Sequence, residues 1–337
     1  MDNETPVLAA GIKAKLISWW NGYDSPALDV LDRYKQVFLH WWNGDPESPS
    51  GVNLGARRVR KRAIEAPHAK KQDISARAMI SQALWGEGNL TPGPAEYVTE
   101  LTARLGLTPE MSMLDLGAGL GGPSRAISSA YGVWVTALEA VSLHVKAGME
   151  QSIMHGMGKK VPISQFDPET FDIPARKYDC IFSKEMMHHV KEKKRLIAEI
   201  ERGLKAQGQF IITSYVVTDK GVGGPHVAAW NAADGQVNHF WSKGEYSAAF
   251  AEAKLDLRVT EDLTQRYCEI IADGFRGLMK NMESLLASET EETRQSELRR
   301  ALAFESNRWA VRAEALQSGD IAVLRFSGLN PLRPEIR

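Results

Sequence analysis

The sequence is poor in the features that mark secreted, membrane-spanning and nucleic-acid-binding proteins. It holds only two cysteines, Cys180 and Cys268, which we expect to be buried thiols rather than a disulfide or metal ligands. The formal net charge of −1 leaves no broad basic field that would attract nucleic acid. The first residues lack the basic and apolar regions of a secretion signal, and no apolar run reaches membrane-spanning length. We therefore expect a cytoplasmic protein with no bound metal and no nucleic-acid partner.

The composition is that of a globular protein with a sizeable core, because 43% of the residues are hydrophobic and 25% are charged. The length of 337 residues allows one large domain with additions, or two smaller domains. The first part of the chain differs in character: residues 12–20 and 27–42 have helical apolar spacing, and the tetrapeptide Trp-Trp-Asn-Gly lies at the end of each expected helix, at residues 19–22 and 41–44. We expect a helical N-terminal extension over residues 1–75 and a main domain over residues 76–330.

A basic run, Arg57 to Arg62, follows these two helical stretches. Such a run is most often a solvated helix face or a linker. Together with the tryptophans it also fits a patch that contacts an anionic membrane surface. The sequence therefore leaves open a weak peripheral membrane contact through residues 12–62, and it does not indicate the oligomeric state.

The most informative segment is residues 113–124, in which Met-Leu-Asp-Leu runs into a cluster of glycines. An apolar stretch that enters glycines and then helical spacing predicts a strand, a tight turn and a helix. Glycine lets the backbone approach a ligand closely, and the helix amides face the same place. Gly117, Gly119 and Gly122 fit the dinucleotide pattern G-x-G-x-x-G, which alone is a weak signal. Asp115 would repel a pyrophosphate, but it would attract a ligand that carries an amino group and a sulfonium.

Four further apolar segments predict strands in series, at residues 133–138, 161–167, 178–183 and 208–214. Glu139 follows the first of these, where a carboxylate can accept both hydroxyls of a ribose. The pattern Asp115-x-Gly117-x-Gly119-x-Gly121, followed by these segments in order, resembles the class I S-adenosylmethionine (SAM)-dependent methyltransferases. The resemblance covers residues 77–328.

This resemblance implies a doubly wound, Rossmann-like α/β fold with a seven-strand sheet, a helical N-terminal extension and a helical cap. Residues 216–240 and 264–317 are the expected acceptor-covering insertion and cap. It also implies SAM as the cofactor, with Asp115 at the methionine end, Glu139 at the ribose and Asp167 at the adenine. The cofactor-binding residues that it implies are Asp115, Gly117, Ala118, Gly119, Gly121, Glu139, Ala140, Asp167, Pro168, Ser183, Lys184 and Glu185. Pro168 is a departure, because proline removes a backbone donor that many relatives aim at the adenine.

Two segments resemble the phosphoethanolamine and glycine/sarcosine/dimethylglycine N-methyltransferases in particular. Residues 85–93, Trp-Gly-Glu-Gly-Asn-Leu-Thr-Pro-Gly, resemble a segment that covers the methionine portion of SAM in those enzymes, although a glycine-rich loop between helices is the alternative. Residues 183–190 resemble their S-R-D-x-x-x-H segment, with His189 at the catalytic-histidine position. Histidine suits proton removal because its pKa lies near neutral pH. His189 and His188 are the catalytic candidates, with packing or helix capping as the alternative.

The acceptor is less well specified by the sequence. Aromatic side chains can hold a methylated ammonium by cation–π contact, although such residues more often pack in a core. The tyrosine that partners the histidine in the phosphoethanolamine enzymes is absent from residues 72–75. The substrate-binding candidates are Trp85, Leu90, Tyr215, Trp230 and Trp241, and Lys184, Arg266 and Arg276 are candidates for holding a phosphate.

The predicted function is methyl transfer from SAM to a small-molecule amine, such as a phospho-, amino-acid-like or lipid-headgroup amine, by in-line displacement. O- or C-methylation of a natural product or lipid is the nearest alternative. A non-catalytic SAM-binding protein and a nicotinamide dehydrogenase are alternatives from other classes, and Asp115 fits the last of these poorly.

Overall fold

A computed structural model of the protein describes residues 71–287 and 292–332. The expected helices of the N-terminal extension, the Trp-Trp-Asn-Gly repeats, the basic run and the membrane contact through residues 12–62 lie outside the described residues. Within the described ranges, no helix combines the length and the hydrophobicity that crossing a bilayer requires.

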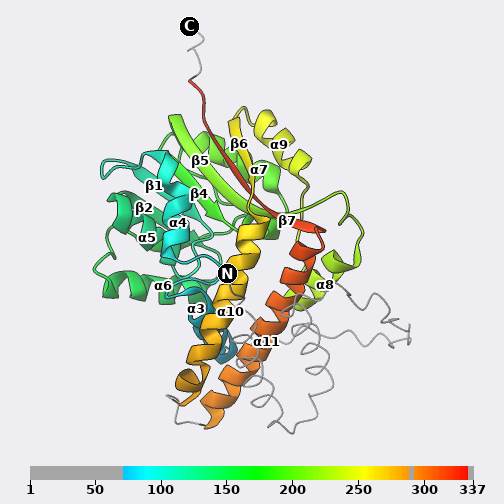
Figure 1. Ribbon diagram of the computed structural model, residues 1–337. Coiled ribbons are helices and arrows are strands. Elements are labelled where there is room, and N and C mark those ends of the chain that lie inside the picture. The colour runs from blue at the N-terminus through cyan, green and yellow to red at the C-terminus, as the bar shows by residue number, and fades with distance from the viewer. Residues whose placement is uncertain (1–70, 288–291, 333–337) are drawn as a thin grey trace, which may run out of the picture.

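The centre of the fold is a seven-stranded sheet in the order β3-β2-β1-β4-β5-β7-β6 (Figure 1). Strands β1 to β5 run parallel to one another, whereas β7 is antiparallel to both β5 and β6. The predicted doubly wound, seven-strand fold is therefore confirmed. The strands are β1 (Ser112–Leu116), β2 (Trp134–Glu139), β3 (Ile163–Gln165), β4 (Tyr178–Lys184), β5 (Leu204–Val217), β6 (Asp256–Asp262) and β7 (Ile321–Leu329).

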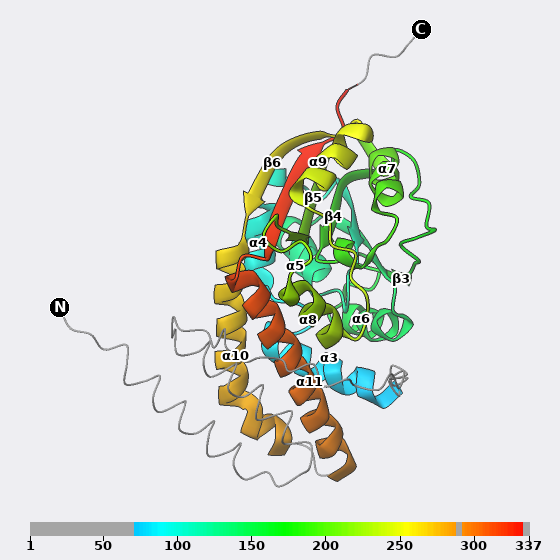
Figure 2. The same cartoon turned by 90° about the vertical axis from the view of Figure 1, so that its right-hand side faces the viewer.

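Helices cover both faces of the sheet, as Figure 2 shows. Met113 of β1 packs into a cluster with α4 and α5, while Leu114 and Leu116 pack on the opposite face with α7 and α9. A strand that is buried on both faces needs apolar side chains on both, and β1 supplies Met113 on one face and Leu114 and Leu116 on the other. These helices are α4 (Ala95–Thr102), α5 (Gly122–Tyr131), α7 (Lys193–Gly203) and α9 (Lys243–Glu252), and α6 (Ser142–Met154) joins β2 to β3.

A separate helical layer lies beyond the ends of the strands. It consists of α3 (Lys71–Trp85), α8 (Pro225–Asp234), α10 (Thr264–Ala287) and α11 (Glu292–Gln317), which contact one another. Figures 1 and 2 both show α10 and α11 side by side, extending away from the sheet. The predicted helical stretch after residue 264 is thus two long helices, and the predicted insertion after β5 contains α8.

Helices α3 and α10 approach closely because α10 carries glycine where they meet. Trp85 is buried there, edge-on to Phe275 at a ring distance of 6.0 Å and to Trp309 at 4.9 Å. A Cβ added to Gly274 would lie 2.3 Å from the Trp85 ring, whereas one added to Gly277 would meet nothing within 4 Å. Trp85 therefore belongs to the packing between these helices.

The two glycines of α10 make a matched test of this packing. Gly277→Ala is expected to stabilise the protein by about 0.5–1 kcal/mol, because alanine favours the helix. Gly274→Ala is expected to destabilise it by about 1–3 kcal/mol, because the helix must move away from Trp85. Urea denaturation followed by circular dichroism measures both free energies of unfolding. Equal stabilisation by the two substitutions would contradict the close approach at Gly274.

Candidate active site

A cavity of about 470 Å³ opens at the carboxyl ends of β1, β2 and β4. Open parallel sheets bind their ligands at this edge. The 85–93 segment, the glycine turn after β1, the ends of β2 and β4, and side chains of α3, α8 and α11 form its wall. One part of the cavity wall is therefore formed by the segments that the sequence predicted to bind the cofactor. Another part is formed by helices, of which α8 and α11 are distant from these segments in the sequence.

The glycine turn brings bare backbone to the cavity. Gly117, Gly119 and Gly121 have φ angles of +86°, +58° and +79°, in the left-handed region that glycine adopts without strain. A Cβ on Gly117 would lie 2.5 Å from the Met186 side chain, so no larger residue fits there. Gly117 and Gly119 line the cavity, whereas Gly121 faces Ile163 on the far side of the turn.

Asp115 is a buried acid at the base of the cavity, with 1% of its surface exposed. The Ser124 hydroxyl donates a hydrogen bond to its carboxylate at 2.5 Å. Burial raises the pKa of Asp115 to about 7, against the opposing effect of the Ser124 bond, and the charge of Glu139 raises it further. The carboxylate is thus only partly ionised at neutral pH, and a cation beside it would favour the ionised form.

Glu139, at the end of β2, is held in a different electrostatic state. Its carboxylate accepts hydrogen bonds from the backbone amides of Gly119 and Val141, both at 2.9 Å, and His144 lies 3.5 Å away. Burial raises its pKa, but the bonds from His144, Val141 and Gly119 together lower it below the usual value. Glu139 is therefore an ionised acceptor that lines the cavity.

The remaining cofactor candidates divide into two groups. Ala118, Ala140, Pro168, Lys184 and Glu185 line the cavity. Asp167 instead closes its own turn, where its carboxylate accepts bonds from the Glu169 amide at 2.9 Å and the Thr170 hydroxyl at 3.0 Å. Ser183 is buried and donates to the Leu116 carbonyl at 2.9 Å, which ties β4 to β1. On these contacts Asp167 and Ser183 hold the backbone rather than face the cavity, and Phe166, which the sequence reasoning missed, lines the wall beside Pro168.

The 85–93 segment is fastened to the cavity by polar contacts. The Lys184 ammonium donates to the Thr91 hydroxyl at 2.7 Å and forms a buried ion pair with Glu185 at 3.0 Å. The Gly122 amide donates to the Gly88 carbonyl at 3.0 Å, which seats the segment on the glycine turn. Leu90 lines the cavity, whereas Trp85 turns away into the contact between α3 and α10.

The two histidines after β4 have different environments. His189 lines the cavity, with its Nδ1 atom 3.0 Å from the Gln236 amide nitrogen. Desolvation by the surrounding protein lowers the pKa of His189 to about 4, and the charges of Arg312 and Arg308 act in the same direction, so its imidazole is neutral at pH 7. His188 is buried between Tyr215 and Phe240, at ring distances of 4.9 and 6.0 Å, and burial lowers its pKa well below the usual value. Only His189 is placed to meet a ligand.

The aromatic acceptor candidates pack within the protein instead of lining the cavity. Tyr215 and Trp230 are fully buried and lie edge-on to each other at 4.7 Å, in the cluster formed by the helical layer. Trp241 packs on Tyr246 of α9 at 5.3 Å. Such rings gain most from burying their large apolar area. The cavity wall near His189 is polar instead, and it comprises Arg77, Asp234, Gln236, Glu305 and Arg308.

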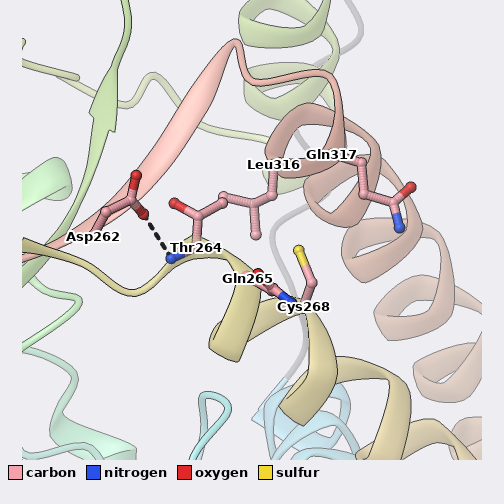
Figure 3. A pocket seen from close by; sticks show the side chains of 6 residues that line it. All are labelled: Asp262, Thr264, Gln265, Cys268, Leu316 and Gln317. Atoms are coloured by element: carbon pink, nitrogen blue, oxygen red, sulfur yellow. Dashed lines mark hydrogen bonds between the residues drawn. The ribbon is translucent and has the colours of Figure 1, made fainter.

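A second hollow, of about 500 Å³, lies at the start of α10 (Figure 3). Its lining residues are Asp262, Thr264, Gln265, Cys268, Leu316 and Gln317. The Asp262 carboxylate accepts a hydrogen bond from the Thr264 amide at 2.8 Å and so begins the helix. Cys268 and the buried Cys180 are both free thiols, and this hollow contains none of the predicted site residues.

Comparisons with known proteins agree with this arrangement. Residues 114–212 match the family model described as a methyltransferase domain. Sterol 24-C-methyltransferase of Yarrowia lipolytica is 31% identical over 126 residues, which are 37% of this chain and 33% of that protein. Phosphoethanolamine N-methyltransferase 2 of Caenorhabditis elegans is 25% identical over 215 residues, 63% of this chain and 48% of that protein. The solved structure of Haemonchus contortus phosphoethanolamine N-methyltransferase 2 in complex with S-adenosyl-L-methionine has a TM-score of 0.66 and 18% identity, over 78% of this chain and 59% of that chain.

The resemblance inferred from the sequence is confirmed over residues 114–212, which match a methyltransferase domain, and the sheet has the fold of the methyltransferase structure to which the chain is similar. The chain spans about a third and about a half of the lengths of the two curated relatives. The activities named for these relatives therefore describe those longer proteins and are not assigned to this chain by the matches.

Replacing Asp115 with asparagine is expected to stabilise the protein above neutral pH. The pKa of Asp115 is about 7 in the folded state against the usual 3.8, so folding binds a proton between these values and stability falls as pH rises through them. The full effect at about pH 8 is at most about 4 kcal/mol. Urea denaturation at about pH 5 and pH 8 should show an advantage of Asp115→Asn over the wild type that grows with pH.

Asp179 is a control of opposite sign. Burial raises its pKa, but hydrogen bonds from Lys205 and Ser112 lower it below the usual value, so its carboxylate stabilises the protein at neutral pH and loses this effect in acid. Asp179→Asn should therefore be less stable than the wild type at about pH 8. A loss of stability at that pH in Asp115→Asn would contradict the description of Asp115 as a desolvated acid.

Proposed function

We propose that the protein transfers a methyl group from SAM to a small-molecule amine. The observation that carries this proposal is the presence of two buried carboxylates of different character, Asp115 and Glu139, beside a bare glycine turn in one cavity. The matched methyltransferase domain, residues 114–212, contains both acids and the turn.

The chemistry of the cavity wall fits SAM part by part. The ionised Glu139 offers two acceptor oxygens to the ribose hydroxyls. Asp115 lies where a cationic amino group and sulfonium lower its pKa and gain a charged partner. Phe166 and Pro168 offer apolar contact to the adenine in place of Asp167, which is engaged in its turn. When bound, SAM supplies an electrophilic methyl group, and the protein supplies proximity and orientation.

An amine acceptor is supported by the acidic corner at the end of β4. Glu185 is 4% exposed, lines the cavity and has a φ angle of +55°, a strained conformation that is found at functional sites. Beyond the effect of burial, its charge raises the pKa of the hydroxyls of Tyr97, Tyr215 and Tyr267, so it lies close to all three. A carboxylate in such a setting attracts an ammonium group.

His189 is proposed as the base that accepts a proton from the amine. An amine must lose a proton before its lone pair can attack, and His189 faces the same cavity as a neutral imidazole. Desolvation keeps it neutral, and the charges of Arg312 and Arg308 act in the same direction. His188 has no comparable access, and we assign it to packing.

C-methylation is the second candidate, because the chain is 31% identical to a sterol 24-C-methyltransferase over part of its length. The two functions differ in product. Incubation with SAM and a panel of amines and isoprenoid lipids, followed by mass spectrometry, separates N- from C-methylated products. SAM binding without any product would instead support a non-catalytic SAM-binding protein.

Binding of SAM is expected to tighten as pH rises from about 6 to about 7.5. Below its pKa of about 7, Asp115 carries a proton in the free protein. It must release this proton when the cationic groups of SAM bind beside it. The affinity for SAM therefore rises with pH, by up to about tenfold per pH unit. Isothermal titration calorimetry in buffers of different ionisation enthalpy counts the released proton. Asp115→Asn should abolish the proton release and weaken binding. Heat on titration with NAD but not with SAM would refute the cofactor assignment.

His189→Ala is expected to lower kcat by about 10²–10⁴-fold, the usual effect of removing a general base. The dissociation constant of SAM should change little, because His189 lies at the acceptor end of the cavity. His155→Ala is the control, since His155 is exposed and does not line the cavity. Steady-state kinetics with the acceptor found in the panel gives kcat, and a rate equal to wild type would exclude His189 as the base.

A further inference from the structure

Among the residues that the structure describes, every lysine and arginine that lines the cavity is already paired with a carboxylate. These pairs are Arg77 with Glu305 at 2.9 Å, Lys184 with Glu185 at 3.0 Å, and Arg308 with Asp234 at 2.9 Å and with Glu305 at 3.3 Å. The other two residues that the sequence suggested for holding a phosphate, Arg266 and Arg276, do not line the cavity; each is about half exposed and paired with an acid on its own helix.

Asp234 is the centre of this arrangement. It ends α8, lines the cavity and has a side chain that is 1% exposed. Its carboxylate accepts hydrogen bonds from Arg308 Nε at 2.9 Å, from Arg312 Nη2 at 2.8 Å to each oxygen, from the Trp230 indole at 3.0 Å and from the Asn238 amide at 2.9 Å. The two guanidinium groups of α11 thus have an internal anion in place. Asp234 lines the same cavity as His189, and its charge acts on the His189 ring.

The balance of charges over the whole cavity wall also disfavours an anionic ligand. Five carboxylates line the cavity (Asp115, Glu139, Glu185, Asp234 and Glu305) against three lysines and arginines (Arg77, Lys184 and Arg308). Even when Arg312, bound behind Asp234, is counted, acids outnumber bases once a bound cation has ionised Asp115. A cationic ligand is favoured in such a cavity. An anionic one must displace Asp234 and leave a carboxylate buried without its partners, which is strongly unfavourable.

We infer that Asp234 is a specificity-determining residue that occupies Arg308 and Arg312, so that the acceptor is an amine without a phosphate group. The inference rests on the proposed function and narrows its acceptor class. Asp234 excludes a phosphate from the acceptor, because its own carboxylate occupies the place beside the two arginines that the phosphate would take. Removal of its charge leaves two guanidinium groups of α11 without their main anion, in a geometry suited to bidentate phosphate binding.

The test is a set of calorimetric titrations with ethanolamine, O-phosphoethanolamine and inorganic phosphate, each with and without saturating S-adenosylhomocysteine. The wild type is expected to bind neither phosphate compound more tightly than ethanolamine. Asp234→Asn and Asp234→Ser, checked for fold by circular dichroism, are expected to gain at least about tenfold in affinity for inorganic phosphate through two freed charge-assisted contacts. Asp256→Asn is the matched control, because it removes an exposed arginine-paired carboxylate on β6 and should gain nothing.

Two results would overturn the inference. One is wild-type protein that binds O-phosphoethanolamine at least about tenfold more tightly than ethanolamine, which needs no variant to observe. The other is a pair of folded Asp234 variants whose phosphate affinity equals that of the wild type. Should both variants fail to fold, the comparison of O-phosphoethanolamine with ethanolamine on the wild-type protein decides the inference by itself. Failure to bind S-adenosylhomocysteine would count against the proposed function alone, because the phosphate titrations are also made without it.

Discussion

The parallel pairing of β1 with β2 is the constraint on which the rest of the site depends. Leu116 is in register with Leu138, so the glycine turn and Glu139 leave the two strands at the same level. The amides of Gly117 and Ala118 both donate to the Leu138 carbonyl, and the Gly119 amide donates to the Glu139 carboxylate. A slip of one residue would turn Glu139 to the other face of the sheet. The turn therefore holds the strand register and the ligand-facing carboxylate together.

Much of this layer could be predicted from the sequence, because each signal in it is local. Apolar runs mark the strands, and glycines that need positive φ mark the turn. The placement of two further candidates is also decided locally. The Asp167 carboxylate is followed by the Glu169 amide and the Thr170 hydroxyl, and it closes its own turn with them. His188 and His189 are neighbours in sequence, and only the short helix after β4 decides which of them faces the cavity and which packs against Tyr215.

The acceptor end could not be predicted in the same way, because its residues meet only in the folded chain. Arg77 and Glu305 are 228 positions apart, and Asp234 and Arg308 are 74 apart. Without an alignment, nothing in a single sequence pairs such residues. Aromatic residues were the more visible signal, but burial satisfies them better than a wet cavity does, and Tyr215 and Trp230 support the wall from behind. Glu305 and Arg308 are three positions apart and so lie on one face of α11, and this spacing is a signal of the polar wall that the sequence contains.

Charge connects the cofactor end with the acceptor end. Burial makes Asp115 costly to ionise, and a cationic ligand beside it relieves this cost. The acceptor end keeps its own acids, and its cations are neutralised by them. Methyl transfer from a sulfonium to a neutral amine moves one positive charge from sulfur to nitrogen without changing the total. A cavity whose carboxylates outnumber its cations stabilises that charge at both positions, provided that the proton has first left the amine. His189, which desolvation keeps neutral together with the charges of Arg312 and Arg308, is the group on the wall to which we assign that proton.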